Sequence, residues 1–381
     1  MVPFLFRIAQ TLYKQNTARK FLETQTDAIR IGFGVILFAF VVSACVGVAS
    51  TPAPSATNTP FAPIPALVIP TTDPLAPTPA PQIFDGKHAY DEYLISQMNF
   101  GIRPPGSKAL RATGDYIIAE LKKRGWQVET QEFVYRGVPI RNVIGKFGAG
   151  QGPQAVTPSA ECTRGVTACG AIILGAHYDT RPRANMDKTN PSAPVPGAND
   201  GASGVAVLLE LARSLDKAKL KNEIYLAFFD AEDNGGLSAC DLRIVEMQTV
   251  APACDTTEWT WSIGAEHVAE NLVTKPAAVI VVDMIGDADQ NIHYERNSDK
   301  ELQQGLWKIA EQLGYRQWFI PEDRWSMTDD HTPFLKRGIR AIDIIDFDYP
   351  PWHTTGDTAD KVSAASLERV GRVLEVWVEG R

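Results

Sequence analysis

The sequence has few cysteines, no dense run of lysine and arginine, and no internal repeat. Its 37 lysine and arginine residues are outnumbered by 45 aspartate and glutamate residues, giving a net charge of −8. A chain without a basic cluster lacks the electrostatic footprint of nucleic-acid binding, so we expect no such partner. The absence of repeats favours one large domain over two, and a content of 44% hydrophobic residues excludes a wholly disordered chain.

The N-terminal region predicts export. Residues 31–42 (IGFGVILFAFVV) form a short apolar run that follows several basic residues, a pattern typical of a secretory signal. The run ends in Val42-Ser43-Ala44-Cys45, which resembles a bacterial lipobox in which Cys45 is lipidated. Two alternatives stay open: residues 31–49 could form an uncleaved signal anchor, and Cys45 could be an inert cysteine.

A proline-rich tract separates this leader from the folded part. Residues 51–82 are rich in Pro, Thr and Ala, so they favour extended conformations and cannot pack a core. We therefore divide the chain into a leader or membrane anchor (1–45), a linker (46–82) and a folded domain (83–381). This division predicts a domain tethered to the bacterial cell envelope outside the cytoplasm.

Four cysteines remain in the folded domain, namely Cys162, Cys169, Cys240 and Cys254. An even number in an exported chain permits two disulfides, and closeness in sequence favours Cys162 with Cys169 and Cys240 with Cys254. A zinc–cysteine site is the weaker interpretation, because neither pair has the C-x-x-C spacing. We expect structural roles for these cysteines.

Apolar runs and amphipathic segments alternate in the folded domain. Buried strands are predicted at residues 171–176, 224–229, 278–282 and 341–345, and helices at 109–124, 203–215, 301–313 and 363–378. This alternation predicts an α/β fold, a three-layer α/β/α sandwich with a central, mostly parallel, twisted sheet. Such sheets bind ligands beyond the carboxyl ends of their strands.

Polar residues follow each of the four predicted strands. They are His177 and Asp179, then Asp230, Glu232 and Asp233, then Asp283, and finally His353, while Asp200 opens a helix. Each alone has an ordinary explanation, such as a helix cap, a turn residue or a half-buried imidazole. Together, acids and imidazoles at one sheet edge would repel or remain unpaired without a cation, so the pattern predicts a zinc site.

Seven stretches resemble the zinc-dependent peptidases of family M28, and within it the animal-type glutaminyl cyclases and their bacterial relatives. They are GIRPPGS (101–107), AHYDT (176–180), GANDGASG (197–204), FFDAEDNG (228–235), VVDMIG (281–286), TDDHTPFLKRG (328–338) and WHTTGDT (352–358). The resemblance spans nearly the whole folded domain and implies a zinc-exopeptidase-like fold. One isolated motif would carry little weight.

The resemblance implies roles for individual residues. Asp200, Asp233 and His353 would bind zinc, and Glu232 would transfer protons beside them. Asp233 departs from the Glu found in animal cyclases, and the DAED form resembles bacterial members. We expect the shorter Asp still to bind zinc, with a different reach and geometry.

Two further acids, Asp283 and Asp329, would form a hydrogen-bonded network with the catalytic Glu232. Trp352 and Trp261 are candidates for packing against a small substrate side chain, although core packing is an equally ordinary role for Trp261.

Two functions remain open. In a cyclase, the α-amine of an N-terminal glutamine attacks its own γ-carbonyl carbon, and ammonia leaves to give pyroglutamate. In an M28 aminopeptidase, His177 and Asp283 would bind a second zinc, and a metal-activated water would cleave the N-terminal residue. Asp329 and the Trp352-His353 pair favour the cyclase with one zinc.

The substrates under either function would be peptide or protein N-termini, and we expect a monomer. A non-catalytic binding module is disfavoured because Glu232 and the candidate ligands are all present.

Overall fold

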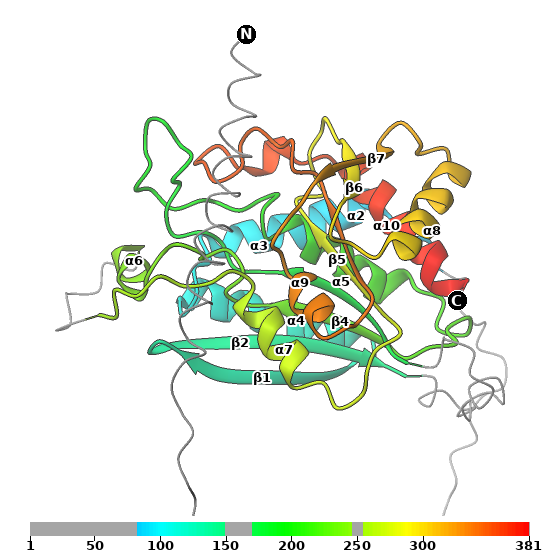
Figure 1. The fold of residues 1–381 in the computed structure, drawn as a ribbon, viewed down its shortest axis with the longest axis horizontal. Coiled ribbons are helices and arrows are strands. Elements are labelled where there is room, and N and C mark those ends of the chain that lie inside the picture. The colour runs from blue at the N-terminus through cyan, green and yellow to red at the C-terminus, as the bar shows by residue number, and fades with distance from the viewer. Residues whose placement is uncertain (1–81, 149–169, 246–253, 381) are drawn as a thin grey trace, which may run out of the picture. The chain divides into compact units, whose positions relative to one another are not determined.

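The computed structural model describes residues 82–148, 170–245 and 254–380, and Figure 1 shows their arrangement. The predicted leader with Cys45, nearly all of the predicted linker, and the predicted Cys162–Cys169 pair lie outside the described residues. The folded unit extends over Ala80–Arg381. None of the helices in the described ranges has both the length and the apolar character needed to cross a membrane.

Six strands form the main sheet, in the order β1-β2-β4-β3-β5-β8. Their bounds are β1 Gln127–Tyr135, β2 Val138–Phe147, β3 Ile172–His177, β4 Ile224–Phe229, β5 Ala278–Asp283 and β8 Ala341–Ile345. The last four in this order pair in parallel, whereas β1 and β2 form an antiparallel hairpin added to the β4 edge. The predicted mostly parallel sheet is confirmed.

Helices cover both faces of this sheet. The helical elements are α2 Gly86–His88, a π-helical turn Ala89–Leu94, α3 Ile95–Phe100, α4 Lys108–Lys123, α5 Ser203–Ser214, α6 Ala239–Val245, α7 Ile263–Glu270, α8 Lys300–Gln312, α9 Thr332–Lys336, a 3-10 turn Ala359–Lys361 and α10 Ala364–Glu379. Neighbouring residues of β3 show the two faces, because Leu174 packs in the core with α5 and α10 while Ile173 packs with α7 and α9. The predicted three-layer sandwich is confirmed (Figure 1).

The four predicted helices are present within one or two residues of their expected bounds, and side-chain caps mark where α4 and α8 begin. Ser107 caps α4 by accepting a hydrogen bond from the backbone N–H of Leu110 at 3.0 Å. Asp299 caps α8 in the same way through the N–H of Leu302, also at 3.0 Å. The hairpin β1–β2 and a small second sheet of β6 Ile292–Glu295 and β7 Phe319–Trp325 were not predicted.

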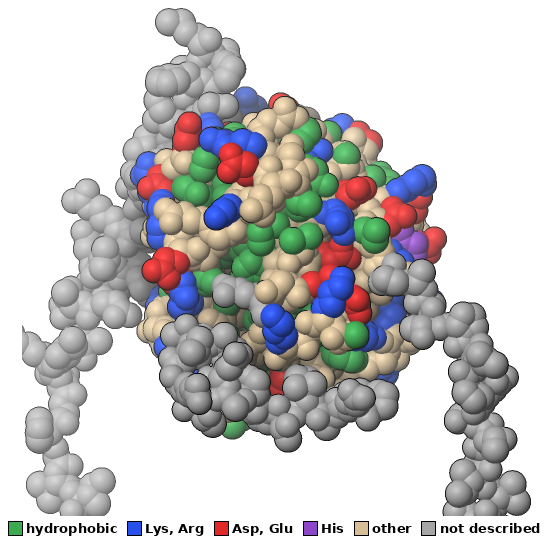
Figure 2. Space-filling model, turned by 90° about the vertical axis from the view of Figure 1, so that its right-hand side faces the viewer, with side chains coloured by type: hydrophobic (Ala, Val, Ile, Leu, Met, Phe, Trp, Pro, Cys, Tyr) green, Lys and Arg blue, Asp and Glu red, His purple; other side chains and the backbone are tan. Residues whose placement is uncertain are grey.

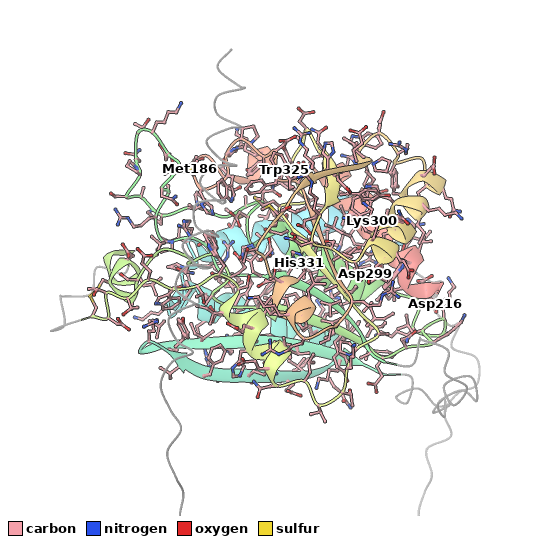
Figure 3. The ribbon with its side chains drawn as sticks, in the orientation of Figure 1. Met186, Asp216, Asp299, Lys300, Trp325 and His331 are labelled. Atoms are coloured by element: carbon pink, nitrogen blue, oxygen red, sulfur yellow. A yellow bond between two sulfur atoms is a disulfide. The ribbon has the colours of Figure 1, made fainter. Side chains whose placement is uncertain are left out.

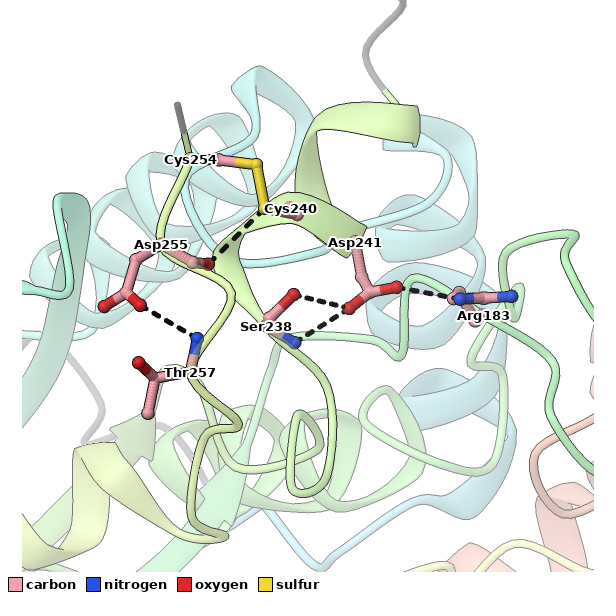
Figure 4. Close-up of a disulfide and its surroundings, with 7 residues drawn as sticks. All are labelled: Arg183, Ser238, Cys240, Asp241, Cys254, Asp255 and Thr257. Atoms are coloured by element: carbon pink, nitrogen blue, oxygen red, sulfur yellow. Dashed lines mark hydrogen bonds and ion pairs between the residues drawn. A yellow bond between two sulfur atoms is a disulfide. The ribbon is translucent and has the colours of Figure 1, made fainter. Parts of the chain in front are cut away.

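The predicted disulfide between Cys240 and Cys254 is present, and it joins α6 to the segment that leads toward α7 (Figure 4). The Cα atoms are 5.3 Å apart, within the usual range for a disulfide. Next to it, the Asp241 carboxylate accepts hydrogen bonds from Ser238 and pairs with Arg183 at 2.8 Å. The disulfide therefore links α6 covalently to the segment before α7.

Few large hydrophobic side chains are exposed among the described residues, and they are scattered (Ile83, Phe100, Val134 and Val273). On the face shown in Figure 2, acidic and basic side chains are interspersed. Isolated exposed hydrophobic residues are normal on soluble domains. The chemistry of this fold is instead concentrated in buried polar residues at one sheet edge.

Candidate metal centre and active site

Three polar side chains meet where β3 and β5 end. His177 ends β3, Asp283 ends β5, and Asp200 lies in the turn before α5. The Nε2 atom of His177 lies 3.2 Å from Oδ1 of Asp200 and 3.2 Å from Oδ1 of Asp283. Parallel strands bring their carboxyl ends to one edge, which explains this meeting across 106 residues of sequence.

A second group contains Asp233, His353 and again Asp200. The Nε2 atom of His353 lies 2.9 Å from Oδ1 of Asp233 and 3.8 Å from Oδ2 of Asp200. Within each group the donor atoms lie within 4.8 Å of one another, and all five side chains are buried. Asp200 belongs to both groups, with one oxygen toward each histidine, which is the arrangement of a carboxylate that can bridge two cations.

The donor set fits zinc. Carboxylate oxygens and imidazole nitrogens are zinc ligands, and three of them leave a position open for substrate. Buried acids this close to one another are costly unless protons or a cation compensate their charges. The structure brings the predicted ligands Asp200, Asp233 and His353 together, and the shorter side chain of Asp233 still reaches the group.

Asp357 holds the loop that carries Asp200. Its carboxylate accepts hydrogen bonds from the backbone N–H groups of Asn199 at 2.8 Å and Asp200 at 3.1 Å, and from the hydroxyl of Tyr349 at 2.7 Å. Burial and the nearby Asp200 raise the pKa of Asp357 to about 7. No role was predicted for Asp357, although it lies within the WHTTGDT motif.

Asp179 holds the second loop of the site. Its carboxylate accepts hydrogen bonds from the backbone N–H groups of Glu232 at 3.1 Å and Asp233 at 3.2 Å. The side-chain amide of Asn234 donates to it as well, at 3.0 Å, and His177 Nδ1 lies 3.5 Å away. Asp179 therefore orients a candidate ligand from each group and the candidate catalytic Glu232 together.

Glu232 is buried beside other acids. Burial raises the pKa of Glu232 well above its usual range, and the Asp329 carboxylate raises it further. Burial also raises the pKa of Asp283, although the hydrogen bond from His177 partly offsets this. The three acids of the predicted network, Glu232, Asp283 and Asp329, thus all lie in one buried region.

Asp330 extends this acidic region and was not predicted. It is fully buried, and neither of its carboxylate oxygens has a hydrogen-bond partner among the described residues. Burial, followed by the charge of Asp329, raises its pKa well above the usual range. Its position in the TDDH motif, directly after Asp329, was the available signal. Figure 3 labels the next residue, His331, near α9.

A cluster of apolar side chains borders the group of Asp200, Asp233 and His353. Its buried members are Met284, Met327, Ile345, Phe347, Tyr349 and Trp352, with Met186 and Trp325 packed against them. Trp352 stacks on the His353 imidazole with ring centroids 3.8 Å apart, and Trp261 lies nearly parallel to the same ring at 6.2 Å. Figure 3 places Met186 and Trp325 toward the same end of the molecule. Both predicted tryptophans therefore flank a candidate ligand.

Backbone strain also concentrates at this site. Among the described residues, five non-glycine residues have positive φ, and four of them, Ala231, Ser262, Met284 and His353, lie in or next to the site. Such conformations cost about 1–3 kcal/mol each, and they persist where the surrounding structure holds them. The strain is consistent with a site whose side-chain directions are set by its surroundings.

The chain belongs to peptidase family M28, whose sequence pattern matches residues 162–378. The bovine glutaminyl-peptide cyclotransferase is 23% identical over 304 residues, which cover 72% of this chain and 77% of that protein. The structure of Porphyromonas gingivalis glutaminyl cyclase matches with a TM-score of 0.65 and 29% identity, over 78% of this chain and 99% of the cyclase.

A leucine aminopeptidase precursor from Bacteroides thetaiotaomicron is equally similar in fold. Its structure matches with a TM-score of 0.64 and 29% identity, over 79% of this chain and 99% of that protein. Overall similarity to these two structures therefore establishes the family and the fold but does not choose between the two activities.

Proposed function

We propose that this chain is a zinc-dependent glutaminyl-peptide cyclotransferase, which converts the N-terminal glutamine of peptides to pyroglutamate and releases ammonia. The observation that carries the proposal is that two buried acids, Glu232 and Asp329, interact: burial, followed by the charge of Asp329, raises the pKa of Glu232. A shared acid network of this kind suits a residue that must both accept and return a proton. The sequence relatives named glutaminyl-peptide cyclotransferase, such as the bovine protein, support the same function.

The residues of the site would divide the work as follows. Zinc held by Asp200, Asp233 and His353 would supply a Lewis acid for the γ-carbonyl oxygen. The α-amine of the substrate is itself the nucleophile, so no external nucleophile is needed. Glu232 takes the proton from this attacking α-amine and returns it to the departing amide nitrogen. Trp352, stacked on His353, offers a flat apolar surface for the short glutamine side chain.

Aminopeptidase activity is the second candidate, and a specific observation supports it. His177, Asp200 and Asp283 form the other buried group that could hold a metal ion. Under the cyclase proposal this group holds no tightly bound zinc, because Asp283 would belong to the acid network that the resemblance implies. We therefore expect one zinc per chain by elemental analysis of the purified protein, whereas two tightly bound zincs would favour the aminopeptidase.

Mass spectrometry of two peptides tests the proposal directly. The zinc-loaded protein is incubated with a peptide that begins with glutamine and with the same peptide beginning with leucine. We expect the glutamine peptide to lose ammonia while the leucine peptide stays intact. Removal of the first residue from either peptide would instead identify an aminopeptidase.

A further inference from the structure

Arg181 is a buried arginine that reaches three separate parts of the site. It follows β3 by four residues, and its side chain is 1% exposed. Its Nη1 donates to the backbone carbonyl of Asp233 at 2.9 Å, and its Nη2 donates to the carbonyl of Gly235 at 3.2 Å. Its Nε donates to Oδ1 of Asn185 at 2.6 Å. The guanidinium also lies over the Trp261 ring, 5.2 Å from its centroid.

The distances indicate which part of Asp233 the arginine holds. Its Nη1 makes a short bond to the Asp233 backbone carbonyl, at 2.9 Å, and a longer hydrogen-bonded ion pair with Oδ1 of the Asp233 carboxylate, at 3.5 Å. That same Oδ1 lies 2.9 Å from Nε2 of His353. Arg181 therefore fixes the backbone of Asp233 while its carboxylate stays directed toward the other candidate ligands.

The same arginine also constrains Trp261 from two sides. The guanidinium covers the indole ring, and Gly235, whose carbonyl it binds, packs directly against that ring. A Cβ atom at Gly235 would lie only 2.1 Å from the indole, so the ring occupies space that only glycine leaves open. Trp261 in turn lies nearly parallel to the imidazole of His353.

We propose that Arg181 is a positioning residue that couples the two halves of this site, setting both the Asp233 ligand and the Trp261 surface. The part of this inference that concerns Trp261 and the substrate rests on the proposed function, whereas the part that concerns Asp233 and zinc does not. A planar guanidinium can bind two carbonyls and a side-chain amide at once and stack on an aromatic ring, whereas lysine presents a single ammonium. A partner that orients a ligand in this way typically contributes 10–100-fold to metal affinity.

The test measures zinc affinity and steady-state kinetics separately in Arg181→Gln and Arg181→Lys. Competition with a chromophoric chelator gives the zinc dissociation constant without any activity assay. We expect Arg181→Gln to raise this constant at least tenfold and to raise KM for a glutamine peptide. Arg181→Lys should rescue little, because the charge alone does not replace the planar contacts.

Two control variants separate the effect of Arg181 on zinc binding from its effect on Trp261. Arg183→Gln removes a nearby arginine that pairs with Asp241 on α6 (Figure 4), and it should leave both the zinc constant and KM unchanged. Gly235→Ala should displace Trp261 and raise KM with little change in zinc affinity. If Arg181→Gln does not fold, Asn185→Ala tests the same idea, because it removes the contact at Nε and should weaken zinc binding more mildly.

An unchanged zinc constant in a folded Arg181→Gln variant would overturn the positioning role. A raised zinc dissociation constant together with an unchanged KM would overturn the coupling to Trp261. Failure of the proposed function is a separate result, because it would appear as an inactive or peptide-cleaving wild-type protein, while the zinc measurement would still test Arg181.

Discussion

Replacing Glu232 with glutamine isolates the proton transfer, because glutamine keeps the contacts that Glu232 makes. Oε1 of Glu232 accepts a hydrogen bond from the Ser262 hydroxyl at 3.5 Å, and the amide oxygen of glutamine can accept the same bond. The backbone N–H of Glu232 donates to Asp179, and its carbonyl accepts from the N–H of Ser262 at 3.2 Å, so both contacts survive the change. Glutamine has the same shape and is neutral. Since burial and Asp329 already raise the pKa of Glu232, a neutral side chain should not destabilise the fold.

The size of the effect follows from the role assigned to the carboxylate. A positioned general acid or base contributes about 10²–10⁴-fold to rate, and each tenfold step corresponds to about 1.4 kcal/mol. We therefore expect Glu232→Gln to lower kcat by at least about 100-fold, or about 3 kcal/mol in barrier height. Continuous detection of released ammonia from a glutamine peptide measures this loss.

Zinc content and stability serve as the controls for this variant. Glu232 lies in neither candidate metal group, so we expect the same zinc content as in the wild type and an unfolding free energy at pH 8 that is equal or higher. A folded, zinc-bearing Glu232→Gln protein with wild-type turnover would refute the assignment. Loss of zinc together with activity would show that Glu232 acts as a ligand instead.

Two further predictions concern stability. Burial raises the pKa of Asp346 to about 7, so between about pH 4 and 7 the folded chain holds a proton that the unfolded chain releases. Through this proton alone, the unfolding free energy should fall by up to about 4 kcal/mol as pH rises through that window, and Asp346→Asn should remove this contribution from the slope measured in urea titrations. His331 pairs with Glu295 at 3.3 Å, both fully buried, but Glu295 keeps hydrogen bonds from Ser298 and Met327. His331→Gln should therefore cost about 1–3 kcal/mol, below the loss for an uncompensated buried charge, and an unchanged urea midpoint would contradict this.

The parts of the fold that sequence analysis predicted are those with strong periodic patterns. The four parallel strands are largely apolar runs because both of their faces are buried. The predicted helices carry apolar stripes, and α4 and α8 also have side-chain caps. The hairpin gave a weaker signal. Strand β1 lies at the sheet edge and has no buried residue, so its sequence QVETQEFVY lacks an apolar run.

Strand β6 escaped prediction for a different reason. Its sequence, IHYE, is entirely buried although two of its four residues are polar. Those polar side chains are accommodated by tertiary contacts, such as the pair between Glu295 and His331, that no local pattern reports. A short segment with polar residues is typical of a loop, so its sequence does not predict a buried strand unless the distant partners of those residues are known.

The sequence by itself determined the residue types at the strand ends and their order along the chain. Because parallel strands share one carboxyl edge, that was enough to predict that His177, Asp200, Asp233, Asp283 and His353 would meet. It was also enough to associate them with zinc chemistry through the M28 motifs.

Only the tertiary structure decided how these side chains divide into two candidate metal groups. It placed Asp200 in both candidate metal groups, set Asp357 behind the Asp200 backbone, and brought Arg181 to Asp233 and Trp261. These arrangements depend on loop backbones, several in strained positive-φ conformations, and on hydrogen bonds between segments up to 158 residues apart. Such contacts are set by packing in three dimensions, which leaves no periodic trace in the sequence.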